Sequence, residues 1–210
     1  MEVVKGVHLI ETYANCALIS NNRLVLIDTS VDDTAKDIFS WLRKNGHAPG
    51  DLTSVIITHT HPDHVLGLKA VKSRAPGAKV AAGKDDADYI ARTKVYPGPP
   101  GPQRHDAVPV DVRLEDGQSY EGFLVIATPG HTPGHISLLD KERKLLVAGD
   151  ALNNEKALGP MPDQYNIDPK QHRASIKKLA NYEFETVIMG HGKPILRGAG
   201  AQVKALAATL

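Results

Sequence analysis

The segment Thr-His-Thr-His-Pro-Asp-His, residues 58–64, places three histidines and one aspartate close together. Imidazole nitrogens and carboxylate oxygens bind divalent metals and also act as general acids and bases. In an extended segment residues two apart share a face, so His59 and His61 can bind the same ion. The following proline keeps His61 out of helical geometry, and Asp63 and His64 then fall at the start of the next helix. The spacing predicts a metal site between a strand end and a helix start.

Three more ligand-type residues follow apolar runs. His131 comes after Leu-Val-Ile-Ala-Thr-Pro-Gly, Asp150 after Leu-Leu-Val-Ala-Gly and His191 after Thr-Val-Ile-Met-Gly. Strand ends that meet at one edge of a sheet bring distant residues together, and α/β sheets bind ligands there. Two metals about 3.5–4 Å apart, bridged by a carboxylate and a water, would use all these groups. The donors suit zinc, iron or manganese, and the lack of cysteine among them argues against a closed structural zinc site.

Short β-branched runs predict buried strands that would position these residues. The predicted strands cover residues 23–28, 54–59, 79–83, 123–131, 136–140, 144–150 and 186–191. Hairpin turns are predicted at 115–117 and 140–143, so antiparallel pairs are mixed with helical crossovers. The proline-rich residues 96–111 predict a long surface loop.

Helical spacing predicts four helices between and after these strands. The first is capped by Asp33 and stopped at Gly46, and the second runs from about His64 to Pro76. The third has Asp168 as N-cap with Pro169 in its first turn, and a last helix carries Val203 and Leu206. Strands that alternate with helices in this way predict an α/β fold.

Composition predicts one domain over residues 1–210. The chain has 25 basic and 24 acidic residues, so we expect neither nucleic acid nor a membrane surface as partner. No apolar run has membrane-spanning length, and the N-terminal residues carry charges where a secretory signal needs an apolar core. Cys16 is the single cysteine and cannot form an intramolecular disulfide. We therefore expect a cytoplasmic protein that acts on a small molecule; composition does not predict an oligomeric state.

The ordered motifs resemble those of the metallo-β-lactamase superfamily over nearly the whole chain. They are the aspartate of Leu-Ile-Asp-Thr, the His-x-His-x-Asp-His segment, and the lone His131, Asp150 and His191. The resemblance implies a four-layer αββα sandwich of two mixed β-sheets. It implies that one metal is held by His59, His61 and His131, the other by Asp63, His64 and His191, with Asp150 as the bridge. It also implies that Asp28 lies behind the ligands and supports them. The local sequence around His131 and His191 looks most like the glyoxalase II-like branch.

The resemblance predicts a hydrolase in which two divalent ions, zinc foremost and iron or manganese as alternatives, share a bridging hydroxide. The hydroxide attacks an ester-like bond: a thioester, lactone, phosphoester or β-lactam. Asp63 and Asp150 are the candidate catalytic residues, as proton carriers to the leaving group. Only residues 192–210 follow His191, which weakens the assignment to a glutathione thioester, since glyoxalase II looks like a catalytic domain with a helical extension.

Two other functions remain open. A mononuclear iron persulfide dioxygenase of the same superfamily resembles the hydrolases closely. A binding module with an inactive site would also keep the fold, although all the ligand positions are retained here. Metal content separates the first of these from the hydrolase.

Several further residues have a structural and a functional interpretation. His135 fits a hydrogen-bonded position beneath the site rather than a further ligand. His172 lies on the apolar side of its helix and is predicted to pack, and Cys16 is predicted to be a small buried side chain. Tyr165 and Lys156 are expected to be exposed loop residues, with a place in the substrate pocket as the alternative.

Overall fold

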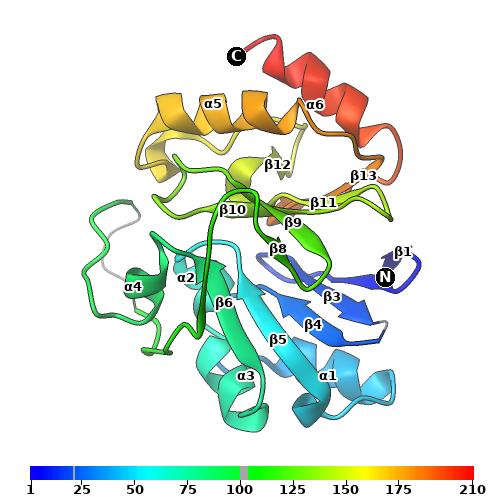
Figure 1. Cartoon of the computed structure of the whole chain (residues 1–210), viewed down its shortest axis with the longest axis vertical. Coiled ribbons are helices and arrows are strands. Elements are labelled where there is room, and N and C mark those ends of the chain that lie inside the picture. The colour runs from blue at the N-terminus through cyan, green and yellow to red at the C-terminus, as the bar shows by residue number, and fades with distance from the viewer. Residues whose placement is uncertain (21, 100–103) are drawn as a thin grey trace.

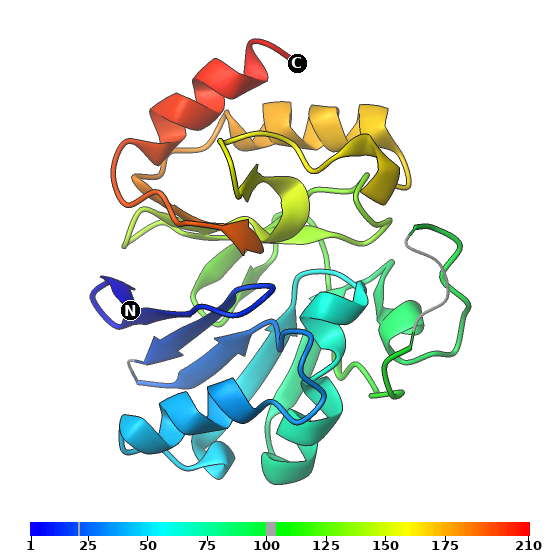
Figure 2. The ribbon, with the colours of Figure 1, turned by 180° about the vertical axis from the view of Figure 1, so that it is seen from behind.

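The structure, a computed structural model, describes residues 1–20, 22–99 and 104–210. Two β-sheets pack face to face and helices cover the outer face of each, which gives the four layers of Figure 1. Seen from behind, the same order of helices, sheet, sheet and helices is clear (Figure 2). The predicted αββα sandwich of two mixed sheets is therefore confirmed. In the three described ranges, no helix is long and apolar enough to cross a membrane.

The first sheet contains seven strands in chain order. They are β1 (Glu2–Val4), β2 (Val7–Ile10), β3 (Cys16–Ser20), β4 (Leu24–Ile27), β5 (Leu52–Ile57), β6 (Lys79–Gly83) and β7 (Val112–Leu114). Strands β1 to β4 pair antiparallel, whereas β4 to β7 pair parallel. Parallel strands end at the same edge of a sheet. The segments that follow β4, β5 and β6 are therefore brought together.

The second sheet contains five strands in the order β13-β11-β10-β9-β8. Their bounds are β8 (Ser119–Tyr120), β9 (Phe123–Ala127), β10 (Ile136–Asp140), β11 (Leu145–Val147) and β13 (Thr186–Ile188). A separate pair, β12 (Asn153–Asn154) and β14 (His191–Gly192), is parallel. Within the five-stranded sheet, β11 and β13 pair parallel, and the other pairs are antiparallel.

Helices lie on both outer faces and in the loops of the site. The longer helices are α1 (Lys36–Lys44) and α3 (Leu68–Arg74) below the first sheet, and α5 (Pro169–Leu179) and α6 (Ala199–Ala207) above the second. The short ones are α2 (Pro62–Val65), α4 (Ala87–Ile90), η1 (Pro49–Asp51), η2 (Gly149–Ala151) and η3 (Asp163–Tyr165). Because only residues 58–61 separate β5 from α2, the first turn of α2 lies at the sheet edge where the predicted ligands meet.

Apolar side chains form three layers of core, one at each junction between layers. Leu9, Ile27 and Phe123 belong to the layer between the two sheets and are buried. Leu42 belongs to the layer between the first sheet and helices α1 and α3. Leu179 belongs to the layer between the second sheet and helices α5 and α6. Full burial of such a side chain stabilises the fold by about 1.5–3 kcal/mol. The inner layer holds the two sheets, and hence the two halves of the site, against each other.

Most of the predicted elements are present. All the predicted strands occur, and the Asp168 carboxylate accepts a hydrogen bond of 2.9 Å from the Gln171 backbone N–H, as an N-cap does. The predicted cap Asp33 is wrong, because Asp32 instead accepts from the backbone N–H groups of Thr34 and Lys36. The parts of residues 96–111 that the structure describes contain no helix or strand, whereas residues 100–103 lie outside the described residues.

Two further predictions differ from the structure. The turn at 115–117 does not form a hairpin, because β7 belongs to the first sheet and β8 to the second. The hairpin of this region is β8–β9, whose two-residue turn has Glu121 at φ 50° and Gly122 at φ 86°. The helix predicted from His64 onward is divided into α2 and α3 near Gly67, where a Cβ atom would lie too close to the Thr29 carbonyl oxygen.

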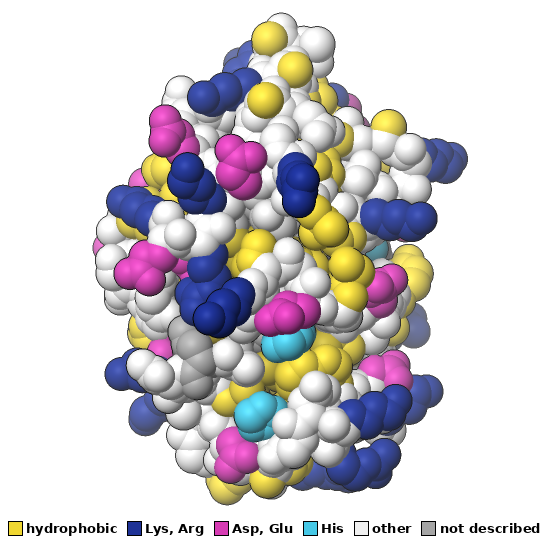
Figure 3. Space-filling model, turned by 90° about the vertical axis from the view of Figure 1, so that its right-hand side faces the viewer, with side chains coloured by type: hydrophobic (Ala, Val, Ile, Leu, Met, Phe, Trp, Pro, Cys, Tyr) yellow, Lys and Arg dark blue, Asp and Glu magenta, His cyan; other side chains and the backbone are white. Residues whose placement is uncertain are grey.

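Charged side chains are mixed over the face that Figure 3 shows. Lys and Arg side chains alternate there with acidic, apolar and uncharged ones, and they do not gather into one basic area. This distribution agrees with the near balance of 25 basic and 24 acidic residues in the sequence.

Gly83 ends β6 directly beside the loop that carries His131. A Cβ atom at this position would overlap the backbone carbonyl oxygen of Gly134. Because neither backbone can move without disturbing a sheet, we expect Gly83→Ala to lower the free energy of unfolding by about 1–3 kcal/mol. Gly77→Ala is the control, since no described atom lies within 4 Å of its added Cβ. Equal urea midpoints for the two variants would contradict this close packing.

Candidate metal centre

The predicted ligands come from four segments that leave the two sheets at the same edge. Residues 59–64 follow β5, and His131 follows β9. Asp150 lies in η2 directly after β11, and His191 begins β14 after β13. The structure brings all seven predicted ligands together as overlapping groups whose donor atoms lie within 4.8 Å of one another: His59, His61 and His131; His59, His64 and Asp150; and Asp63, His64 and His191.

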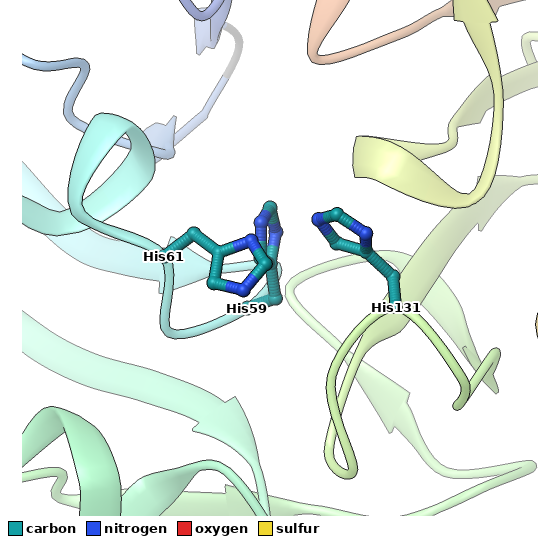
Figure 4. Close-up of side chains that lie close together, drawn as sticks. All are labelled: His59, His61 and His131. Carbon is teal, nitrogen blue, oxygen red and sulfur yellow. The ribbon is translucent and has the colours of Figure 1, made fainter. Parts of the chain in front are cut away.

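The first group consists of three imidazole rings that point toward one another (Figure 4). The ring centroids of His59 and His131 are 4.7 Å apart, and those of His61 and His131 are 4.4 Å apart. The Nε2 atom of His61 lies 3.1 Å from the Tyr96 hydroxyl, and the Nδ1 atom of His131 lies 2.9 Å from the Asn166 side-chain oxygen. These contacts leave Nδ1 of His61 and Nε2 of His131 available to an ion.

Asp150 lies between the first group and the remaining ligands. Its Oδ2 atom is 3.3 Å from Nε2 of His131 and 3.4 Å from Nε2 of His191, and its Oδ1 atom is 3.3 Å from Nε2 of His64. The Asp63 carboxylate is 3.1 Å from Nε2 of His191. A carboxylate that reaches both groups of donors has the placement that a bridging ligand needs.

Four buried atoms at this centre lack a hydrogen-bond partner in the described part of the chain: Nε2 of His59, His64 and His131, and Oδ1 of Asp150. A buried polar atom without a partner costs about 1–3 kcal/mol, and more when the group is charged. A divalent cation would satisfy these nitrogen and oxygen atoms together. The mixture of imidazole and carboxylate donors fits zinc, iron or manganese.

The pKa values of the ligand histidines shift in opposite directions at the two ends of the centre. Burial, together with the neighbouring His131, lowers the pKa of His61 to about 3, and burial lowers that of His59 as well. Burial alone would also lower the pKa of His191, but hydrogen bonds to Asp150 and Asp63 raise it to about 10. The carboxylates thus stabilise positive charge beside His191 strongly enough to overcome desolvation, which is the environment a cation requires.

Asp28 lies directly behind the ligands. The chain leaves β4 through Asp28 at φ 60°, a left-handed conformation that aspartate tolerates better than most residues. Its carboxylate accepts hydrogen bonds of 2.8 Å from both the backbone N–H and the hydroxyl of Thr58. It also lies 2.8 Å from Nδ1 of His64. This contact fixes the His64 ring with Nε2 toward the centre, in agreement with the supporting position expected for Asp28.

The predicted hydrogen-bonded position of His135 is confirmed. Its Nδ1 atom lies 2.8 Å from the Thr128 hydroxyl, and its Nε2 atom accepts a 3.0 Å hydrogen bond from the Asp150 backbone N–H. Since Nε2 accepts, Nδ1 carries the proton and donates to Thr128. His135 therefore positions the loop of Asp150 from below.

Two residues predicted to be internal are buried. His172 has no exposed surface, and its Nε2 atom accepts from the Met161 backbone N–H at 3.3 Å, as a packing histidine does. Cys16 is also fully buried, and burial raises the pKa of its thiol. Neither side chain belongs to the described lining of the cavity over the ligands.

Asp86 is a site residue that the sequence analysis missed. Its buried carboxylate accepts hydrogen bonds from the Thr60 backbone N–H at 2.9 Å, the Thr132 hydroxyl at 2.6 Å and the Gly134 backbone N–H at 2.7 Å. Thr60 lies between two predicted ligands, and Thr132 follows His131 directly. Asp86 therefore joins the two ligand loops. Its surroundings in the sequence, Lys-Asp-Asp-Ala-Asp, resemble an ordinary exposed loop and carry no signal of this role.

A cavity of about 360 Å³ opens over the ligands. His61, Asp63, His131, Asp150 and His191 form its floor. Tyr13, Val31, Asn153, Glu155, Met161, Pro162 and Tyr165 are among the residues that form its walls. Tyr165 thus takes the pocket position considered for it, whereas Lys156 is exposed and does not belong to the described lining. A centre that opens into a cavity can accept a small molecule beside its ligands.

Comparison with known proteins agrees with this geometry. Residues 9–191 match the family described as the metallo-beta-lactamase superfamily. The chain belongs to the metallo-β-lactamase superfamily. A structure of a metallo-β-lactamase from Cronobacter sakazakii superposes with a TM-score of 0.74 at 25% identity, covering 91% of this chain and 77% of the other. Members of this superfamily bind divalent metals, and the converging donors provide for such binding here.

Two curated relatives bear on the branch of the superfamily. A probable metallo-hydrolase of Bacillus subtilis is 29% identical over 92% of this chain and 86% of its own length. A hydroxyacylglutathione hydrolase of Ectopseudomonas mendocina is 31% identical over 70% of this chain, which matches only 48% of that relative. The predicted resemblance to the glyoxalase II-like branch is confirmed, and the chain spans about half the length of this hydroxyacylglutathione hydrolase.

The hydrogen bonds of Asp86 predict a stability effect at a distance from the ligands themselves. The amide N–H group of an Asp86→Asn side chain would face the hydrogen-bond donors that now bind the carboxylate. We therefore expect the free energy of unfolding to fall by about 1–3 kcal/mol. Asp85→Asn is the matched control, because Asp85 is adjacent in sequence but exposed, and we expect a change within about 0.5 kcal/mol. Urea unfolding of both variants without added metal measures the difference. An Asp86→Asn variant as stable as the control would refute the joining role.

Proposed function

We propose that this chain is a metal-dependent hydrolase that cleaves an ester-like bond with the help of two divalent ions. The observation that carries the proposal is the convergence of all seven predicted donors, five of which form the floor of an open cavity, with Asp150 lying between the two predicted sets of metal ligands. A structural metal site is normally closed by protein ligands, whereas a catalytic site keeps a position open to substrate. Zinc is the metal we expect first, with iron or manganese as alternatives.

The relatives support hydrolysis as the reaction type. The Bacillus relative is described as a probable metallo-hydrolase and the Ectopseudomonas relative as a hydroxyacylglutathione hydrolase. Thioesters, lactones, phosphoesters and β-lactams all present an electrophilic centre and an oxygen on which negative charge develops. We propose this class of bond as the substrate.

The proposed chemistry divides between the ions and the chain. Two divalent ions, one held by His59, His61 and His131 and the other by Asp63, His64 and His191, would lower the pKa of bound water toward about 7 and polarise the oxygen of the substrate. Asp150 is held rigid, since it is buried and its backbone N–H is fixed by His135. Asp63 lines the cavity with a side chain that is 23% exposed. Asp63 is therefore the better placed of the two candidate catalytic aspartates to pass a proton to a leaving group.

Metal content tests the dinuclear proposal. We expect untagged protein purified without added metal to contain about two equivalents of zinc, iron or manganese per chain, because Asp150 lies between the His131 and His191 ends of two separate donor groups. Plasma mass spectrometry measures all three metals in one sample. One equivalent, all of it iron, would favour the persulfide dioxygenase instead. Protein that takes up none of these metals would overturn the metal centre.

Substitution of Asp63 tests its part in proton transfer. At full metal occupancy, we expect Asp63→Asn to lower kcat by about 10²–10⁴-fold, because an amide cannot carry the proton. Metal content and thioesterase activity are measured on the same preparation, so that lost metal is not mistaken for lost chemistry. The exposed Asp33→Asn variant is the control. An Asp63→Asn enzyme with both metals and an unchanged kcat would remove Asp63 from this role.

A further inference from the structure

Three large apolar side chains are exposed at the cavity over the ligands. Tyr13 is 71% exposed, Val31 43% and Tyr165 41%, and all three line the cavity. Other large apolar residues that are exposed, among them Val95 and Leu196, do not belong to its described lining. Exposed apolar side chains that gather at one place, next to converging polar groups, are typical of a ligand-binding surface.

These three residues form an apolar rim and come from separate loops. Tyr13 follows β2, Val31 follows β4 and Tyr165 ends η3. Met161 and Pro162 extend the same wall toward the ligands. Packing of the core does not require these loops to present large apolar groups to water, so their convergence over the ligands favours a role in binding.

Two of the three rim loops, those of Tyr13 and Tyr165, are held to the ligand loops by hydrogen bonds. The Asn15 side-chain amide donates to the backbone oxygens of Met189 and Gly192 at 3.1 and 2.8 Å, which joins the Tyr13 loop to the segment of His191. The Asn166 amide donates to the Met161 backbone oxygen at 3.0 Å, while its oxygen lies 2.9 Å from Nδ1 of His131. The wall is thus preformed, and a ligand loses little free energy in ordering it.

The charge of the lining narrows the substrate further. Apart from the proposed metal ligands, Glu155 is the charged side chain of the described lining, which contains no Lys or Arg. A carboxylate on the substrate tail would therefore meet a like charge and find no cation among the described lining residues. A glutathione conjugate, which carries carboxylates, fits this wall poorly.

We infer that the site takes thioesters or oxygen esters whose acyl chain is apolar and without negative charge, lying against Tyr13, Val31 and Tyr165. This substrate class rests on the hydrolytic function proposed above. For a thioester, the oxygen of water bonds to the carbonyl carbon as the carbon–sulfur bond breaks. One proton of the water goes to the departing sulfur, and the products are a carboxylic acid and a thiol.

The size of the cavity sets the length of that chain. About 360 Å³ lies at the lower end of the range of roughly 300–1,000 Å³ for small-molecule sites. A short to medium acyl chain fits such a volume together with the ester group. A long lipid chain would extend beyond it into water.

A set of N-acetylcysteamine thioesters tests the inference directly on the metal-loaded enzyme. From acetyl to hexanoyl, we expect kcat/KM to rise about fourfold for each added methylene, as burial of that group requires. Adipoyl matches hexanoyl but ends in a carboxylate, and we expect it to be poorer by about tenfold. Hydrolysis that ignores chain length, or that favours adipoyl, would overturn the inference and leave the hydrolase proposal standing.

Variants connect the preference to the apolar rim. We expect Tyr13→Ser to lower the hexanoyl-to-acetyl ratio of kcat/KM about threefold or more, and Tyr13→Leu to retain it. Glu155→Gln should narrow the hexanoyl-to-adipoyl preference. Leu196→Ser is the control, since Leu196 is as exposed as Val31 but lies outside the described lining. Equal ratios for Tyr13→Ser and Leu196→Ser would contradict the role of the rim.

Binding separates this inference from the hydrolase proposal. The corresponding thioethers, in which a methylene replaces the thioester carbonyl, cannot be hydrolysed, and calorimetry gives their Kd. Thioethers that bind in the predicted order, beside thioesters that remain intact, would support the ligand class and refute hydrolysis. Thioethers with no preference for the uncharged chain would refute the ligand class, whatever the activity.

Discussion

The centre of this protein is governed by the cost of burying imidazole and carboxylate groups that have no protein partner. Nε2 of His59, His64 and His131 and Oδ1 of Asp150 are removed from water and aimed at a common region. Burial of such atoms raises the free energy of the folded chain unless a partner binds them. A divalent ion would provide such a partner, and the surrounding hydrogen bonds keep these atoms facing inward.

Three neighbouring side chains orient the ligand histidines. Each contacts the ring nitrogen that does not point to the centre. Asp28 contacts Nδ1 of His64, Asn166 contacts Nδ1 of His131, and Tyr96 contacts Nε2 of His61. With one ring nitrogen engaged, the other nitrogen of each ring is directed to the centre. The supporting hydrogen bonds and the ligand geometry are therefore parts of one arrangement.

Local patterns were sufficient to predict the strands and the gathering of the ligand-type residues at one sheet edge, whereas the four-layer sandwich was predicted from the resemblance to the superfamily. A β-branched run that leads into a histidine or aspartate predicts a strand and a candidate ligand at its end, as at His59 and His191. Asp86 was not predictable in this way, because its partners at residues 60, 132 and 134 are distant in sequence. The hairpin at 115–117 failed for a related reason: the turn residues are of the right kind, but the chain crosses there from one sheet to the other.

The apolar rim was equally hidden. Tyr13 and Val31 stand in short polar loops with no periodicity, and their meeting with Tyr165 depends on how three connections fold over the ligands. Only the three-dimensional arrangement shows that exposed apolar side chains are gathered rather than scattered. A motif that predicts the ligands of a centre thus does not predict the cavity walls above it, and these walls determine which substrates can bind.

The ligands also come from both sides of the molecule. Residues 59–64 follow β5 of the first sheet, whereas His131, Asp150 and His191 follow β9, β11 and β13 of the second. An ion held by both sets would link the sheets at one edge, and linkage between binding and conformation is reciprocal. Whatever factor of affinity is lost when the sheets move apart is the same factor by which a bound ion resists that movement. A metal bound at this site would therefore hold the two halves of the sandwich together only to the extent that it binds the closed arrangement more tightly than the separated one.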